Sequence, residues 1–470
     1  MRQVDELRTS RVGRLAGISA ASVGVIYGYD LSNIAGALRY ITDEFNLSTP
    51  QQETVTTAVV IGQIAGAISG GLLANAIGRK KSMVLVVAGY AAFAVLSAAA
   101  MSVPMLLAAR MLLGLTIGVS VVVVPVFIAE CAPARVRGSV LVAYQLATVC
   151  GVIAGYLAAY LLADAHSWRW MLALAAVPAV LILLLLLPMP DTARWYMLKG
   201  WAVPARQVLR CVEPEADVDE DLAEIARALS EESGGALTEM LRRPYLRATI
   251  FVVGLGFFAH ITGINAIILY SPRLFEAMGF TGNFALLVLP ALVQVAGLMA
   301  VVVSLILVDR LGRRPILLSG IAMMTAADAL LIIVFASASG FTGFAGLLLA
   351  TAGFSFGFGS LLGVYAGESF PARLRSMGSS AMLTSDLVAN AIVASTFLTM
   401  LHSLGGAGTF TVYGLLAAAA FAFVYRFAPE TKGRQLEDIR HLWGSSHLPR
   451  VRATAAELMA ESKAGLRRRR

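Results

Sequence analysis

The stretch Glu130–Arg137 reads Glu-Cys-Ala-Pro-Ala-Arg-Val-Arg, and the stretch Glu368–Arg375 reads Glu-Ser-Phe-Pro-Ala-Arg-Leu-Arg. Five of the eight residues are identical, although the two stretches start 238 positions apart in a chain of 470 residues. Shorter echoes keep the same order: Gly78-Arg79-Lys80 returns as Gly312-Arg313-Arg314, and Pro190-Asp191-Thr192 returns as Pro429-Glu430-Thr431. An internal repeat of this kind constrains the whole fold. The pattern predicts a chain built from two related halves.

The composition argues against a water-soluble globular protein. Charged residues make up 14% of the chain, against about 25% in soluble domains, while hydrophobic residues make up 58%. A soluble protein cannot bury so large an apolar fraction, so we expect lipid to be the solvent. The formal net charge of +8 would suggest a nucleic-acid partner in a soluble protein, but its placement here points to a membrane surface. The three cysteines indicate no disulfide framework.

Twelve apolar stretches are each long enough to cross a bilayer, which needs about 20 helical residues. They lie at 15–38, 54–77, 82–100, 104–128, 139–162, 170–189, 247–270, 285–308, 316–337, 343–366, 378–401 and 409–427. The sequence therefore predicts an all-α membrane protein in four segments. These are a six-helix bundle at 1–190, a cytoplasmic linker at 191–243, a second six-helix bundle at 244–433 and a cytoplasmic tail at 434–470.

The basic residues are concentrated on one side of these spans. With the N-terminus in the cytoplasm, the outer loops contain only Arg39, Arg169 and Arg273 of the 37 lysines and arginines, and Arg110 lies within a span. Cytoplasmic loops carry the excess of basic residues in membrane proteins. We therefore expect a multi-pass protein of the cell membrane (plasma or inner membrane) with both termini in the cytoplasm.

The linker is expected to form short amphipathic helices against the cytoplasmic face. Leu222, Ile225, Ala226 and Leu229 recur in it at helical spacing. Its acidic stretch, 213–224, holds seven carboxylates. These carboxylates belong either to a solvated face or to a surface that binds a partner, and the sequence leaves both interpretations open.

Glycines recur every four residues in two of the predicted spans. The second span holds Gly62, Gly66 and Gly70, and the fourth holds Gly114 and Gly118. Small residues at this spacing allow the backbones of two helices to approach closely within a membrane. The glycines predict tight helix packing and say little about a solute.

Motifs in chain order carry a resemblance to a known family. They are Gly28-Tyr29-Asp30, Gly78-Arg79-Lys80-Lys81, Arg110-xxx-Gly114-xxx-Gly118, Glu130-xx-Pro133-xxx-Arg137-Gly138, Pro190-Asp191-xx-Arg194-Trp195, Gly263-Ile264-Asn265, Asp309-Arg310-Leu311-Gly312-Arg313-Arg314, Glu368-xx-Pro371-xxx-Arg375 and Pro429-Glu430-Thr431-Lys432-Gly433. With these motifs the chain resembles the sugar porter family of the major facilitator superfamily over nearly its whole length. The resemblance implies the major facilitator fold, with two pseudo-symmetric six-helix bundles and alternating access to a site near the middle of the membrane.

Two charged residues lie inside apolar spans. Asp30 is in the first span and Arg110 is in the fourth, where Gly114 and Gly118 share its helical face. A lone charge near the bilayer centre costs about 2.5–3.5 kcal/mol on insertion scales, so such residues usually face the protein interior and pair. The resemblance implies that Asp30 and Arg110 are partners and that Asp30 carries the coupling proton. A structural ion pair that never titrates is the alternative.

The repeated charged motifs are expected to form a cytoplasmic gate. Glu130 and Glu368 lie at helix C-termini, where a carboxylate is disfavoured by about 0.3–1 kcal/mol, and Arg137 and Arg375 lie at helix N-termini. Such charges are explained if they pair between the two halves. The resemblance implies pairs that close the cytoplasmic side when the solute site faces outward. The gate set is Arg79, Glu130, Arg137, Arg313, Glu368 and Arg375.

The expected solute path combines matches to the family with departures from it. The resemblance implies that polar and aromatic side chains contact the solute, and the chain offers Tyr27, Gln145, Asn265, Tyr270 and Asn390. The two glutamines that usually precede Gly-Ile-Asn are replaced by Ala259-His260, and a Gln-Trp pair by Ser385-Asp386. His260 and Asp386 therefore join the candidate set, although His260 is equally explained as a buried core histidine. Asp328 is also intramembrane and has no assigned role.

The departures change the expected solute. An ionised Asp386 only accepts hydrogen bonds, whereas an amide both donates and accepts. A substrate ammonium would supply the cation that a buried carboxylate needs. An amine-bearing polyol is therefore favoured over a neutral hexose. The alternative is that Asp386 bonds a neighbouring helix and a sugar still binds.

These features predict a secondary active transporter that moves a small polar solute, namely a sugar, a polyol or a related amine-bearing metabolite, in symport with protons. The alternatives are a proton-coupled exporter of a metabolite or drug, and a transport-dead nutrient sensor. No enzymatic activity, cofactor or metal is expected, because the sequence shows neither a convergent nucleophile set nor metal-ligand spacing. A monomer is expected, with the solute, protons and the bilayer as its partners and no nucleic acid.

Overall fold

The computed structural model describes residues 11–131, 134–165, 167–212, 218–231, 239–242, 245–337, 340–370 and 372–432. Within these ranges the chain forms helices and connecting turns, and no strand occurs in them. The predicted tail at 434–470 and the acidic residues at 213–217 lie outside the described residues, as do the side chains of Arg137 and Arg375.

The first half of the bundle comprises seven helices. They are α1 (Arg11–Phe45), α2 (Thr49–Ile77), α3 (Arg79–Ala98), α4 (Val103–Cys131), α5 (Ala134–Ala163), α6 (Trp168–Ala173) and α7 (Ala176–Leu186). The linker contains α8 (Ala193–Leu198), α9 (Ala202–Val212) and α10 (Val218–Glu231). The last of these includes the amphipathic helix expected around Leu222, which packs with Ala193, Ala205 and Val208.

The second half is divided into more pieces. They are α12 (Leu246–Ile261), α13 (Ile264–Leu269), α14 (Ser271–Ala277), the π-helical turn η2 (Phe284–Val288), α15 (Leu289–Leu311), α16 (Arg313–Ser337), α17 (Gly340–Phe354), the π-helical turn η3 (Ser355–Gly359), α18 (Ser360–Glu368) and α19 (Ala372–Phe427). The predicted span 247–270 is broken at Gly263, and the predicted span 343–366 contains η3. Breaks of this kind commonly mark functional positions in a helix.

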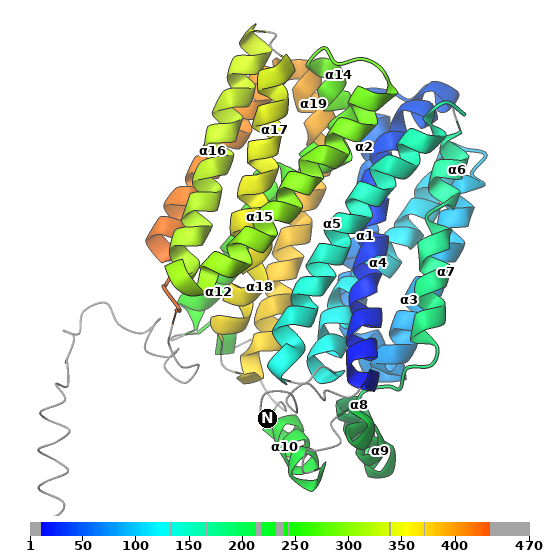
Figure 1. Ribbon diagram of the computed structural model, residues 1–470, viewed down its shortest axis with the longest axis vertical. Coiled ribbons are helices and arrows are strands. Elements are labelled where there is room, and N and C mark those ends of the chain that lie inside the picture. Colours follow the sequence, from blue (N-terminus) through cyan, green and yellow to red (C-terminus); the bar gives the residue numbers. More distant parts are fainter. Residues whose placement is uncertain are drawn as a thin grey trace, which may run out of the picture.

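The helices account for the twelve predicted spans. Ten stretches of the described chain are long and apolar enough to cross a membrane. One of them, Met377–Phe427, covers two predicted spans and bends at Gly405, where φ is 70°. The remaining span lies in α1, which runs the height of the bundle in Figure 1. The all-α membrane fold expected from the sequence is confirmed.

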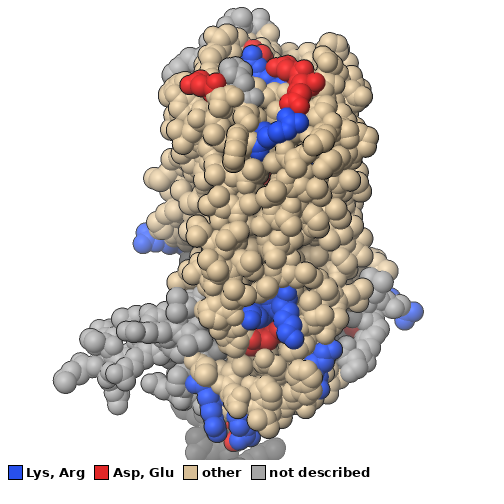
Figure 2. Space-filling model, turned by 90° about the vertical axis from the view of Figure 1, so that its right-hand side faces the viewer, with Lys and Arg blue, Asp and Glu red and all other residues tan. Residues whose placement is uncertain are grey.

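The two halves lie side by side, with α8, α9 and α10 below one end of the bundle and α14 at the other (Figure 1). We call these ends the α8 end and the α14 end. The space-filling view in Figure 2 shows charged residues gathered mainly toward the two ends, with a belt largely free of charge between them. A belt of this kind is what a hydrocarbon core requires of the protein surface.

Two hydrophobic clusters of the described chain contain residues of both halves. A large cluster joins Leu38 of α1 with Tyr270 and Phe397 of the second half. Two further clusters are each confined to one half, one containing Phe127 and the other Phe251. Toward the α8 end a pocket opens between α2 and α19, lined by Ala67, Ile68, Gly71, Val122, Ser380, Leu383 and Thr384. The halves are therefore packed together at the α14 end and separated by a pocket nearer the α8 end.

Candidate functional site

Asp30 and Arg110 form a buried ion pair between α1 and α4. Arg110 Nη1 donates to Asp30 Oδ1 at 2.7 Å, and the two side chains are only 1% and 4% exposed, respectively. Within the described chain, Arg110 Nε has no hydrogen-bond partner. Removing one member of such a buried pair typically costs about 3–5 kcal/mol, because the other charge is left uncompensated. The structure thus brings together the two intramembrane charges that the sequence singled out.

His260 and Asp386 also meet, which the sequence did not predict. The Nδ1 atom of His260, on α12, lies within hydrogen-bond distance of Asp386 Oδ1, on α19. The ring of Phe354 lies edge-on to the imidazole, with the ring centroids 6.0 Å apart. The side chains of His260 and Asp386 are 13% and 10% exposed. Asp386 does bond a neighbouring helix, as one of the sequence interpretations required, and it does so through one of its two oxygens.

Two buried amides near this pair have unused hydrogen-bonding capacity. Asn265 is the second residue of α13, just after the break at Gly263, where φ is 91° and an added Cβ would lie 2.8 Å from the ring of Tyr413. Asn390 follows Asp386 by about one turn of α19 and shares its face. The Asn265 Nδ2 atom and the Asn390 Oδ1 atom are buried without a hydrogen-bond partner in the described chain. Unsatisfied buried polar groups are rare and call for an explanation, and a polar solute supplies one.

Tyr27 and Gln145 are the members of the candidate set that come from the first half. Tyr27 is half-buried, and its electrostatic interactions include Asp386 and Asp30. Tyr144, the residue before Gln145 on α5, interacts with Tyr27 in the same way, and Gln145 is itself half-buried. The carboxylates of both pairs, Asp30 and Asp386, therefore act electrostatically on the Tyr27 hydroxyl.

Tyr270 lies in a closed contact between the halves. Its hydroxyl donates to the carbonyl of Ala394 at 2.5 Å and contacts the hydroxyl of Thr56 on α2. Its ring stacks on Phe397, with the centroids 5.4 Å apart. The sequence grouped Tyr270 with the solute-contacting residues, but in this conformation its hydroxyl joins helices of the two halves.

Glu53 is a further interhelical contact that the sequence reasoning missed. Its carboxylate accepts from the backbone N–H of Thr399 at 2.7 Å and from the Thr399 hydroxyl at 2.6 Å, and the residue is 4% exposed. This contact joins α2 to α19 at the α14 end. The predicted second span began at residue 54, which placed Glu53 just outside the membrane and removed the signal that would have identified it.

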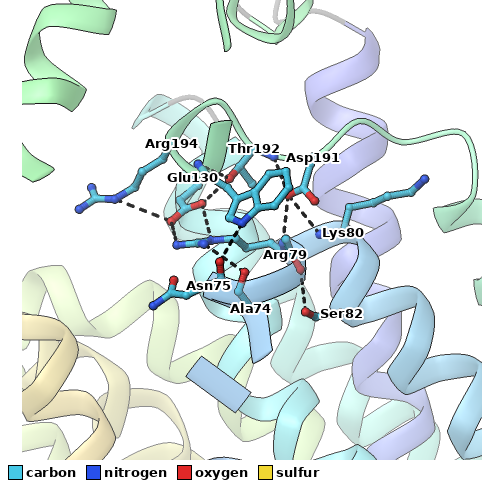
Figure 3. A network of polar contacts seen from close by, with 11 residues as sticks. Ala74, Asn75, Arg79, Lys80, Ser82, Glu130, Asp191, Thr192 and Arg194 are labelled. Carbon is cyan, nitrogen blue, oxygen red and sulfur yellow. Dashed lines mark hydrogen bonds and ion pairs between the residues drawn. The ribbon is translucent and has the colours of Figure 1, made fainter. Parts of the chain in front are cut away.

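At the α8 end, Glu130 is the centre of a polar network (Figure 3). It accepts from Arg79 Nη2 at 3.2 Å and from the Thr192 hydroxyl at 2.5 Å, and Arg194 Nε lies 3.8 Å away. Beside it, Asp191 Oδ1 accepts from the backbone N–H groups of Arg79 at 3.0 Å and Lys80 at 3.3 Å. A carboxylate at this position satisfies the free N–H groups at the start of α3 and interacts favourably with the helix dipole.

The second half repeats this network with equivalent residues. Glu368 accepts from Arg313 Nη2 at 3.5 Å and from the Thr431 hydroxyl at 2.5 Å. Glu430 accepts from the backbone N–H groups of Arg313 and Arg314, both at 3.1 Å. The repeated sequence motifs therefore form the same set of contacts once in each half. We call this set the clasp: it consists of an acid that caps a helix, a hydroxyl beside it, and an arginine–glutamate pair.

The clasps join different pairs of residues from those expected in the cytoplasmic gate. The contacts of Glu130 and Glu368 described above lie within their own halves, whereas pairs between halves were expected. Arg137 and Arg375, the other members of those pairs, have side chains outside the described part. Pairing between the halves remains a prediction for the opposite conformation. Asp328, buried on α16 beside Gly414, belongs to neither clasp.

Comparisons with known proteins match nearly the whole chain. The family model described as "Sugar (and other) transporter" matches residues 16–443. The galactose-proton symporter of Escherichia coli (strain K12) is 34% identical over 426 residues, covering 89% of this chain and 92% of that protein. The arabinose-proton symporter of the same strain is 32% identical over 440 residues, covering 92% and 93%. The solved structure of the proton:xylose symporter XylE bound to 6-bromo-6-deoxy-D-glucose superimposes with a TM-score of 0.79 at 26% identity, covering 92% of this chain and 99% of that one.

Proposed function

The chain belongs to the sugar (and other) transporter family, and from this premise we propose that it carries a sugar across a membrane together with a proton. It is a multi-pass membrane transporter and not an enzyme. Relatives named as galactose-proton and arabinose-proton symporters cover about nine-tenths of its length, which supports both the solute class and the coupling ion.

The buried Asp30–Arg110 pair is the observation that carries the coupling. A carboxylate held against a guanidinium in a low-dielectric interior has two distinct states, one paired and charged and one protonated. Taking up a proton removes the negative charge that holds Arg110, so the contact between α1 and α4 changes with protonation. Tyr27 lies three residues before Asp30, and the carboxylates of Asp30 and Asp386 both act electrostatically on its hydroxyl, which supports a link between the ion pair and the solute path.

The packing of the halves suggests how the solute site opens to one side of the membrane at a time. From the excess of basic residues we infer that the α8 end faces the cytoplasm and that the α14 end faces the outside. Tyr270 and Glu53 hold the halves together at the α14 end, so this conformation is closed to the outside. In the opposite conformation these contacts separate, and Arg137 and Arg375 pair with acids of the other half to close the cytoplasmic side. The transporter acts as a monomer.

Solute binding is assigned to the residues around the middle of the membrane. Asn265 and Asn390 supply the open amide atoms, and His260 and Asp386 stand beside them. Tyr27 and Gln145 contribute from the first half. Amides suit sugar hydroxyls because each can both donate and accept hydrogen bonds.

The coupling is tested with protein reconstituted into proteoliposomes. We expect Asp30→Asn to abolish sugar accumulation driven by a pH gradient while leaving exchange of labelled for unlabelled sugar measurable, because exchange requires no net movement of protons. Asp328→Asn is the matched control, since it removes another buried carboxylate that has no contact with Arg110, and it should accumulate sugar as the unmodified protein does. Gradient-driven accumulation at full level in Asp30→Asn would refute the proposed role of Asp30.

A further inference from the structure

The charges buried in the membrane interior do not balance. Among the Asp, Glu, Lys and Arg side chains of the described chain, those buried between the two ends are Arg110 and the three acids Asp30, Asp328 and Asp386. Arg110 forms its ion pair with Asp30. Asp386 has His260 beside it, and the contact between them occupies one of the two carboxylate oxygens. Between the two ends, the buried acids of the described chain therefore outnumber the buried lysines and arginines.

The unused hydrogen-bonding atoms near Asp386 are acceptors on α19 and a donor on α13. Asp386 Oδ1 is taken by His260, while its Oδ2 has no hydrogen-bond partner in the part of the chain that the structure describes. Asn390, one turn further on α19, presents an unpaired Oδ1. Asn265 differs from these two residues, because its unpaired atom, Nδ2, is a hydrogen-bond donor. A complementary solute brings several donors to the face of α19 and an acceptor to α13.

Resting on the proposed function, we propose that the sugar carries a cationic amine, whose ammonium binds Asp386 while its hydroxyls bind Asn390 and Asn265. An ammonium offers three donors and no acceptor, which suits adjacent oxygen acceptors, and charge-assisted bonds are about twice as strong as neutral ones. The hydroxyls supply the acceptor that Asn265 requires. His260 is a positioning residue here, because it holds one carboxylate oxygen and leaves the other for the solute.

The test compares matched sugars by calorimetric titration of the full-length protein in lipid nanodiscs. The probes are D-galactose, D-galactosamine and N-acetyl-D-galactosamine, with the corresponding glucose series. We expect each amino sugar to bind at least about tenfold tighter than its neutral parent, a difference of about 1.4 kcal/mol. The N-acetyl forms, which carry the added bulk without the charge, should not share this preference.

Variants identify the group responsible. Asp386→Asn should remove the preference for the amine, Asp386→Glu should keep it even if both affinities fall, and the control Asp328→Asn should leave it unchanged. Each variant is first checked for monodisperse behaviour in size-exclusion chromatography, and Asp386→Glu retains the test if Asp386→Asn fails to fold.

Neutral sugars binding as tightly as amino sugars would overturn the inference, as would a preference that survives in Asp386→Asn. These failures can be distinguished from failure of the proposed function. Proton-driven uptake of a neutral sugar would leave the function intact and the amine assignment wrong, whereas no binding or uptake of any sugar would defeat both.

Discussion

Gly78 joins α2 to α3 at the point where the clasp of the first half closes. Its φ is 106°, a value that residues with a Cβ rarely adopt, and an added Cβ would lie 2.1 Å from Asp191 Oδ2. Gly312 repeats the arrangement with a φ of 97° against Glu430. The glycine thus serves two purposes, since it makes the turn and leaves room for the acid that caps the next helix.

Gly78→Ala is expected to lower the free energy of unfolding by about 2–3 kcal/mol, combining backbone strain with the loss of the cap on α3. Gly200→Ala is the control, because Gly200 has a φ of 75° and nothing within 4 Å of its added Cβ. It should show the strain alone, about 1–2 kcal/mol. Thermal unfolding in detergent measures both. Equal shifts for the two variants would show that the acid plays no part.

Some of the site could be predicted residue by residue and some could not. Asp30 and Arg110 were recognisable because a charge inside an apolar span demands a partner, and each is the other's only suitable partner in the first half. The contact between His260 and Asp386 depends on which face of α12 packs on α19, and hydrophobic periodicity in uniformly apolar spans does not reveal this. The same limitation hid the closed contacts of Tyr270.

At the scale of helices, the glycine-striped spans pack directly on each other. An added Cβ at Gly118 of α4 would lie 2.0 Å from the backbone oxygen of Gln63 on α2, and one at Gly62 of α2 would lie 2.1 Å from the oxygen of Met111 on α4. The stripes predicted close backbone approach, and the structure supplies the pairing of α2 with α4. Where the backbones touch, any side chain forces the helices apart.

Gly118→Ala is therefore expected to destabilise the protein by about 1–3 kcal/mol, the usual cost of overpacking. Gly71→Ala, on α2 and with nothing within 4 Å of its added Cβ, should leave the melting temperature unchanged or slightly raised. The measurement is thermal unfolding of the two variants side by side. A Gly118→Ala protein as stable as the unmodified one would mean that the helices are not in backbone contact.

Spans could be predicted more reliably than their interruptions. The twelve apolar runs all correspond to helical segments, because length and hydropathy suffice to identify a span. The break at Gly263 and the π-helical turn at 355–359 occur inside runs that remain apolar throughout. The joining of two spans into α19 was equally invisible, since a short loop and a bend at Gly405 have similar sequences.

At the scale of the whole molecule, the repeat predicted two halves, but it did not predict at which end they pack together. At the α14 end the carboxylate of Glu53, on α2, accepts two hydrogen bonds from Thr399, on α19, and so joins the two halves. A hydrogen bond to a charged group is worth about 1.5–3 kcal/mol, which is comparable with the difference between two access states. The local sequence therefore does not predict which of the two access states has the lower free energy.

Glu53→Ala is expected to shift the protein toward the conformation open at the α14 end. With Cys131, Cys150 and Cys211 replaced by serine, a cysteine introduced at Leu38, which is 1% exposed in the shared cluster, should react with an impermeant maleimide about tenfold faster. Glu276→Ala is the control, because Glu276 is an acid at the same end whose partner Arg273 lies on its own helix. An unchanged labelling rate in Glu53→Ala would show that the closed end does not depend on this carboxylate.

Each clasp draws its members from a single half. Asp191, Thr192 and Arg194 close the first one although they follow the last apolar run, and Glu430 and Thr431 occupy the matching place after the last run of the second. A gene encoding six helices and one such tail would have specified a complete unit of this kind. Two copies of that product can pair around a two-fold axis before any fusion joins them. Each half of the chain therefore carries a complete clasp of its own, whereas Asp30 belongs to the first half alone and Asp386 to the second.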